Sequence, residues 1–190
     1  RDAQESRGLG DVYKRQCRIG TDNYEAGCLA GKAALDMDEE EINIGIVNFD
    51  ATTENGQSRE KGFRDTVGKD KRAVIVDTIN VNSTIDSAKE EAGKLLERIP
   101  EINVLVTFNE WTSLGVGYAV KEAGLADSVR VVAFDSNVVS VDMLETGEVD
   151  ALIVQNPYAM GYLGVENAYR LLGGHDLDER EVNTLSLIHI

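Results

Sequence analysis

The sequence contains little histidine, cysteine or proline, and these shortages narrow its possible functions. Each of the three residue types occurs only twice among 190 residues. His175 follows a Gly-Gly pair and His189 is the penultimate residue, so the sequence disfavours a catalytic histidine base. Cys17 and Cys28 match no common metal-ligand spacing and have no second ligand cluster nearby. We therefore expect no metal site.

Basic residues are also scarce. The chain has 19 Lys and Arg residues against 34 Asp and Glu residues, which gives a formal net charge of −15. Contacts to nucleic acids or to an anionic membrane surface require clustered basic residues, so both are disfavoured. No apolar run approaches the length of a membrane span, and no apolar core of a signal peptide is visible. The acidity is most simply interpreted as a contribution to solubility.

Motifs of the common nucleotide-binding and hydrolytic enzymes are missing. No Gly-x-Gly-x-x-Gly follows a predicted strand, and neither a Gly-x-x-x-x-Gly-Lys-Ser/Thr loop nor a Gly-x-Ser-x-Gly elbow occurs. Asp50 and Asp135 could in principle hold Mg²⁺, as in phosphoacceptor domains. Such domains need a clustered acidic pair and a lysine at a strand end, which are not found here. The sequence predicts a protein that is not an enzyme and uses no cofactor.

The two ends of the chain differ from its centre. Residues 1–18 show no hydrophobic period, and residues 11–16 (DVYKRQ) and 185–190 (LSLIHI) resemble translated sequencing-adapter sequence. We expect 1–18 to be a non-native or disordered leader and 185–190 to be a non-native tail. The alternative is an ordinary disordered arm and a short final strand. Both ends are left out of the fold prediction.

Between residues 19 and 174, strand and helix patterns alternate. Nearly continuous apolar runs predict strands at 42–49, 72–79, 102–108, 129–134 and 150–155. Helices are expected at 55–69, 83–99, 111–124, 139–147 and 158–174, the second of them with Ser83 or Thr84 as N-cap and Pro100 after its end. This alternation predicts an α/β fold with a doubly wound, parallel, five-stranded sheet.

Polar residues follow the predicted strands, where an open parallel sheet binds its ligands. They are Asp50, Asn80 to Ser83, Asn109, Glu110, Asp135, Asn137, Gln155 and Asn156, with Arg59 in the helix after Asp50. Amides, carboxylates and a guanidinium suit the hydroxyl groups of a small polyhydroxylated ligand. Nearby rings could cover its apolar faces, and these are Phe49, Phe108, Trp111, Phe134 and Tyr158. For each single Asn or Asp, capping a helix is the alternative role.

Five blocks of sequence resemble the periplasmic-binding-protein superfamily, and most closely its ribose-type branch of ABC importer proteins. They lie at 19–35, 56–65, 104–124, 129–137 and 147–168. The same module forms the effector domain of LacI-type repressors. The resemblance implies that 19–156 is the C-terminal lobe of a two-lobed, hinged fold of type I. It also implies that 157–184 returns to a largely missing N-terminal lobe.

The resemblance assigns ligand contacts to Arg59, Asn109, Asp135 and Gln155. Ribose binders place an aromatic residue near Asn82-Ser83, where this chain has none, and Trp111 is the candidate to supply that ring. The implied function is binding of a sugar or similar polyol without catalysis. The implied partner is a membrane permease, and the protein would be a monomer in the periplasm or outside the cell, with a lipoprotein anchor as an option. The rival function is a cytoplasmic sugar-sensing regulator of the LacI type.

Overall fold

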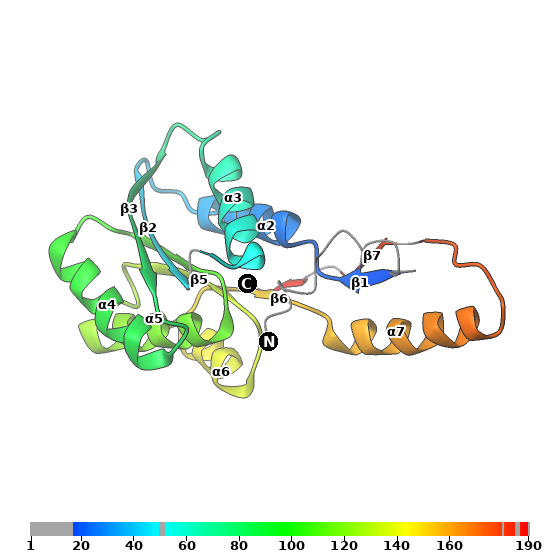
Figure 1. Ribbon diagram of the computed structural model, residues 1–190. Helices are drawn as coiled ribbons and strands as arrows, with labels where there is room; N and C mark the ends of the chain where they lie inside the picture. Colours follow the sequence, from blue (N-terminus) through cyan, green and yellow to red (C-terminus); the bar gives the residue numbers. More distant parts are fainter. Residues whose placement is uncertain (1–16, 50–51, 180, 185–186, 190) are drawn as a thin grey trace. The chain divides into compact units, whose positions relative to one another are not determined.

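The computed structural model describes residues 17–49, 52–179, 181–184 and 187–189 (Figure 1). The chain divides into two compact units. The larger one comprises residues 23–155 together with 186–190, and the smaller one comprises 1–22 together with 156–185. The polar residues that follow the predicted strands belong to the larger unit, except for Asn156. Asp50 lies outside the described residues.

The larger unit is built on a six-stranded sheet with the strand order β3-β2-β4-β5-β6-β8. Five strands are parallel to their neighbours, and β8 pairs antiparallel with β6. The strands are β2 (Ile42–Phe49), β3 (Ala73–Val81), β4 (Val104–Thr107), β5 (Arg130–Phe134), β6 (Ala151–Val154) and β8 (Leu187–His189). Because the chain passes from β3 back across β2 to β4, the direction of winding reverses between β2 and β4, as in doubly wound folds.

Helices cover both faces of this sheet (Figure 1). The helices of the larger unit are α2 (Asn23–Leu35), α3 (Glu54–Val67), α4 (Ile85–Arg98), α5 (Glu110–Ala123) and α6 (Val138–Thr146). Successive strand residues point to opposite faces, so Val104 and Val106 pack with α2 and α3 whereas Leu105 packs with α4 and α5. Two apolar cores result, and burial on both faces explains why the strands are apolar nearly throughout.

Helices α2 and α3 approach each other closely at two glycines. A Cβ atom on Gly27 would lie 2.0 Å from the carbonyl oxygen of Arg59, and one on Gly62 would lie 2.1 Å from the carbonyl oxygen of Tyr24. Both distances are far below van der Waals contact, so only glycine permits this packing. The contact fixes the backbone of α3 at Arg59.

The predicted five-stranded parallel sheet is confirmed, with strand ends shifted by at most two residues. Thr84 caps α4 by accepting a hydrogen bond from the Ser87 amide, and the helix ends at Arg98, before Pro100. The fold prediction left out residues 185–190, but Leu187–His189 form the sixth strand at the edge of β6. An edge strand offers unpaired backbone groups, so a short apolar segment can pair there whatever its origin.

The smaller unit contains β1 (Arg18–Gly20), β7 (Glu181–Asn183) and α7 (Pro157–Leu172). Strand β1 pairs in parallel with β7, and Asp22 donates its backbone N–H to the Asn183 side chain. Helix α7 begins at the Asn156 cap and has no buried residue. Its large exposed apolar side chains are Tyr158, Tyr162, Val165, Tyr169 and Leu172. Their spacing of three and four residues places them along one face of the helix.

The Glu148 carboxylate, just before β6, gives the larger unit a pH-dependent contribution to stability. Glu148 is buried and accepts hydrogen bonds from Lys121 and Thr146, which lower the pKa of its carboxyl. This stabilisation is present above the carboxyl pKa of the unfolded chain and is lost as the pH falls through the folded pKa. Glu148→Gln should lower the midpoint of thermal unfolding by a few degrees at pH 7. The difference should narrow as the pH is lowered toward 3, and a loss that does not change with pH would contradict this.

Candidate functional site

The candidate residues lie at the carboxyl edge of the sheet, beyond strands β4, β5 and β6. Asn109 follows β4, Asp135 follows β5 and Gln155 follows β6. These strands are neighbours in the sheet, so the three residues occupy successive positions along one edge. Arg59 reaches the same edge from α3, through its contacts with the residues at the ends of β4 and β5.

The Arg59 side chain is almost completely buried, with 3% of the residue exposed. Its Nε donates to Oδ1 of Asn23 at 2.9 Å, and its Nη1 donates to the carbonyl oxygen of Phe108 at 2.6 Å. The guanidinium carbon lies 4.9 Å from the centre of the Phe134 ring. Burial lowers the pKa of Arg59 while the Asp135 carboxylate opposes that shift, and an arginine in these surroundings stays charged.

Asp135 has an unusual backbone conformation. Its φ of 66° lies in the left-handed region, where no other non-glycine residue among those described is found. Its N–H donates to the carbonyl oxygen of Ile153 on β6 at 2.9 Å. Its Oδ1 accepts a hydrogen bond of 2.5 Å from Nε2 of Gln155. A left-handed aspartate costs on the order of 1 kcal/mol, a strain often found at functional sites.

Asn109 is the N-cap of α5, so the capping role considered for it from the sequence is the one observed. Its Oδ1 accepts from the Thr112 amide at 3.0 Å, and its Nδ2 donates to Oγ of Ser83 at 2.7 Å. Asn137 likewise caps α6 and donates from Nδ2 to Oε1 of Glu110 at 2.6 Å. The caps orient the beginnings of both helices at this edge.

The aromatic residues divide between the core and the surface. Phe49, Phe108 and Phe134 are at most 6% exposed and belong to the core under α2 and α3, so the expectation that they cover a ligand face is wrong for these three. Phe49 and Phe134 end their strands and Phe108 follows β4, and all three join the core that α2 and α3 cover. Trp111, in the first turn of α5, is 49% exposed. Tyr158 belongs to the smaller unit and is 81% exposed.

Several residues of this edge escaped the sequence-based prediction. Asn23 holds Arg59 from α2, and nothing in its sequence context signals this contact. Ser113 and Thr107 form a buried hydroxyl pair between the ends of β4 and β5. Ser113 follows Asn109 by four residues, which is about one helical turn. This spacing is the only sequence signal for the contact between the two residues.

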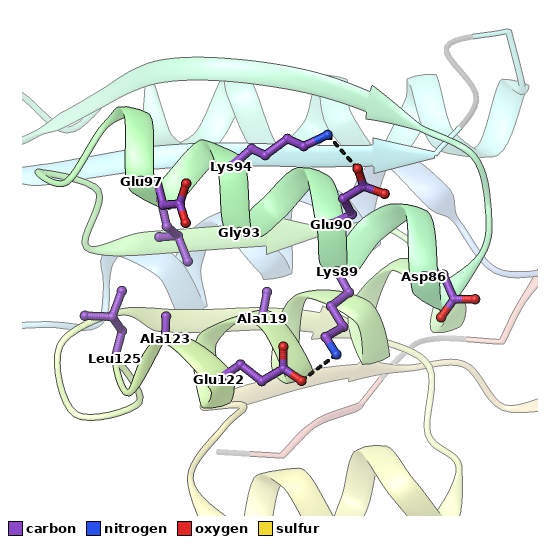
Figure 2. A pocket seen from close by; sticks show the side chains of 11 residues that line it. Asp86, Lys89, Glu90, Gly93, Lys94, Glu97, Ala119, Glu122, Ala123 and Leu125 are labelled. Carbon is purple, nitrogen blue, oxygen red and sulfur yellow. Dashed lines mark hydrogen bonds and ion pairs between the residues drawn. The ribbon is translucent and has the colours of Figure 1, made fainter.

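A hollow of about 630 Å³ lies elsewhere, between α4 and α5, and Figure 2 shows the side chains around it. Leu96, Ala119 and Leu125 contribute apolar surface to it. The two lysines around it are held in ion pairs, Lys89 with Glu122 and Lys94 with Glu90. None of the candidate ligand residues lines this hollow. Among the described residues, no group of three or more His, Cys, Asp or Glu side chains could hold a metal ion.

Comparison with known proteins decides the family. The family described as the periplasmic binding protein domain matches residues 7–176. The chain belongs to this family. A periplasmic binding protein domain is consistent with the five parallel strands and with the polar side chains at the carboxyl edge of the sheet. No helix in the described part of the chain is long and apolar enough to span a membrane.

Individual relatives of this periplasmic binding protein domain carry more specific names. The D-ribose/D-allose-binding protein of Pseudomonas aeruginosa is 30% identical over 156 residues, which are 82% of this chain and 49% of that protein. The solved structure of GanP, a glucose-galactose binding protein from Geobacillus stearothermophilus, is similar with a TM-score of 0.87 and 29% identity, over 99% of this chain and 64% of that one. The HTH-type transcriptional regulator DegA of Bacillus subtilis is 27% identical over 124 residues, 63% of this chain and 35% of the regulator.

The chain spans about half the length of the first curated relatives that it matches, 49% and 48%. The resemblance to the periplasmic-binding-protein superfamily is confirmed over the matched residues, 7–176. The activity, the substrate and the partners of a complete protein are questions for proposal and experiment.

Proposed function

We propose that this chain is one lobe of the solute-binding component of an ABC importer and that it binds a sugar or a similar polyol without catalysing a reaction. The observation that carries the proposal is the buried Arg59 beside the paired side chains of Asp135 and Gln155 at the carboxyl edge. The proposal is supported by the family and by relatives named for binding ribose, allose, glucose and galactose.

Five side chains share the proposed contacts with the ligand. The Asp135 carboxylate accepts from sugar hydroxyls, and Arg59 donates to ring or hydroxyl oxygens with the N–H groups not used toward Asn23 and Phe108. Gln155 and Asn109 add amide donors and acceptors. Trp111, which is half exposed, offers a ring to an apolar sugar face. Buried hydroxyls need partners of this kind, because an unpaired polar group is costly.

The proposed mechanism is closure of two lobes on the ligand, with 19–156 as one lobe and 157–184 as the return to the other. The apolar stripe on α7 supports this division, because Leu172 is 90% exposed and Tyr158 is 81% exposed. Stripes of this size usually pack against another surface. Ligand would favour the closed state by contacting both lobes. A membrane permease would then recognise that state, which places the protein in the periplasm or outside the cell.

A sugar-sensing effector domain of a transcriptional regulator is the second candidate function. The similarity to DegA supports it, although that match covers less of the chain than the match to the D-ribose/D-allose-binding protein. The two candidates differ in what precedes the lobe: a signal peptide or lipobox for the importer, and a helix-turn-helix for the regulator. Sequencing the intact gene and its neighbours distinguishes them, because adjacent permease and ATPase genes indicate an importer.

Binding is tested by following Trp111, the single tryptophan of the chain. D-ribose and D-allose should each change its fluorescence in a saturable manner, and a chain extended by the second lobe should bind at least about ten-fold more tightly than the 190 residues alone. The longer chain should have the higher affinity because it supplies both sides of the clamp. An amino acid serves as the ligand of other chemistry. The absence of saturable binding by any sugar to the extended chain would refute the proposed function.

A further inference from the structure

A buried hydroxyl outside the proposed ligand contacts lies where β4 and β5 stop pairing. The ladder between these strands ends with the pair Val106 and Val132. Two residues further along β5, the N–H of Phe134 donates to Oγ of Ser113 at 2.9 Å. Ser113 lies on α5, which follows β4, and is 1% exposed. Its hydroxyl therefore takes the place of the backbone acceptor that β4 no longer supplies.

The same hydroxyl reaches three other polar groups. It donates to the carbonyl oxygen of Asn109 at 2.7 Å, lies 2.6 Å from Oγ1 of Thr107 and lies 3.2 Å from the carbonyl oxygen of Phe134. A serine hydroxyl has one hydrogen and two acceptor positions. Donation to Asn109 and acceptance from Phe134 and Thr107 use all three. Both hydroxyl groups of the cluster then have hydrogen-bond partners.

Both backbone groups that Ser113 joins belong to the proposed ligand edge. One is the carbonyl group of Asn109 itself. The other is the N–H of Phe134, the residue directly before Asp135, where the backbone enters its left-handed conformation. A fixed Phe134 backbone limits the directions in which the Asp135 carboxylate can point. Gln155 contacts that carboxylate from the next strand.

We infer that Ser113 is a positioning residue, which sets the spacing between Asn109 and Asp135 without touching the ligand itself. The consequence of this role for sugar binding rests on the proposed function. The effect of Ser113 on the geometry of the edge does not depend on any ligand. Ser113 acts through the backbone, so its loss loosens the ends of β4 and β5 and leaves the rest of the sheet paired.

The test is Ser113→Ala in the 190-residue chain, followed by NMR. Without its acceptor, the Phe134 N–H should exchange with solvent at least about ten-fold faster, because a buried hydrogen bond is lost. The Val131 N–H, which donates to Asp150, reports whether the sheet as a whole has loosened and should keep its protection. The side-chain amide resonances of Gln155 should shift as Asp135 becomes less fixed.

Two further variants make the result specific. Ser128→Ala is the matched control, since Ser128 is exposed and its hydroxyl donates to the carbonyl oxygen of Leu125. Thr107→Val removes the neighbouring hydroxyl and leaves the bond from Phe134 to Ser113 in place. Both variants should keep Phe134 protected. Equal protection of Phe134 in Ser113→Ala and in the unaltered chain would overturn the inference, as would parallel loss of protection at Val131.

Titration with D-ribose and D-allose of a chain extended by the second lobe, unaltered and with Ser113→Ala, separates this inference from the proposed function. If D-ribose shifts Asp135 and Gln155 in the unaltered chain and does so more weakly in Ser113→Ala, both stand. If D-ribose and D-allose shift neither residue while Phe134 still depends on Ser113, the proposed function fails and the positioning role stands. If both chains respond alike and Phe134 stays protected, the positioning role fails and the proposed function stands.

Discussion

Asp135→Ala should lower sugar affinity at least about ten-fold, or about 1.4 kcal/mol, in a chain that carries both lobes of the proposed clamp. The reason is that sugar hydroxyls buried at this edge would lose a charged acceptor, and hydrogen bonds to charged groups are the stronger ones. The guanidinium of Arg59 would also lose the carboxylate that favours its charged form. Isothermal titration calorimetry with D-ribose and D-allose measures the change.

The backbone at residue 135 calls for two companion variants. Alanine is poorly suited to a φ of 66°, so part of any loss could come from the backbone. Asparagine tolerates the left-handed region and keeps the shape of the side chain, so Asp135→Asn isolates the effect of the charge and should also weaken binding. Asp142→Ala, on the exposed side of α6, is the matched control and should bind as the unaltered chain does. Unchanged affinity in both variants of Asp135 would contradict the site assignment.

Arg59→Ala should lower the free energy of unfolding by about 3 kcal/mol or more, because the change leaves buried polar groups without their donor and opens a cavity. The carbonyl oxygen of Phe108 and Oδ1 of Asn23 each lose a hydrogen bond, and the Phe134 ring loses the guanidinium beside it. Urea denaturation followed by circular dichroism measures the difference.

Arg98→Ala is the matched control for this prediction. Arg98 is at the end of α4, and its side chain is 60% exposed in an ion pair with Asp77. Exposed pairs of this kind contribute about 1 kcal/mol at most, so the control should be close to the unaltered chain. Arg59→Lys should remain strongly destabilised, because an ammonium group cannot reproduce the fork of donors or the contact with the ring. If Arg59→Ala lowers the free energy of unfolding no more than Arg98→Ala does, Arg59 does not stabilise this edge of the sheet.

The edge of the sheet shows how far a sequence can locate a site. The positions of Asn109, Asp135 and Gln155 after three apolar runs were predictable, because nearly continuous apolar runs indicate buried parallel strands, and such strands end at the same edge of the sheet. Their contacts were not. Asn109 caps α5, which sequence spacing left open, whereas Asp135 pairs with Gln155 across two strands. Such a pair depends on register, which no local pattern specifies for strands apolar on both faces.

The orientation of the aromatic residues was also not predictable from the sequence. A phenylalanine beside a polar strand end can face either the ligand or the core, and Phe108 and Phe134 face the core. There they surround Arg59, with Phe134 beside the guanidinium and the Phe108 carbonyl accepting its hydrogen bond. Contacts of this kind join residues 49 or more positions apart in the chain, so local sequence carries no signal of them.

The α/β class, the doubly wound parallel sheet and the edge at which polar groups gather were predictable from the amino-acid sequence alone. Hydrophobic periodicity and helix stops are local properties, and they suffice for these conclusions. The pairs of groups that meet became known only from the folded chain: Arg59 with Phe108 and Asn23, Asp135 with Gln155, and Ser113 with Phe134. Hydrogen bonds require partners within about 3 Å. Only the packing of α2 on α3 and of α5 on the sheet brings residues distant in sequence that close.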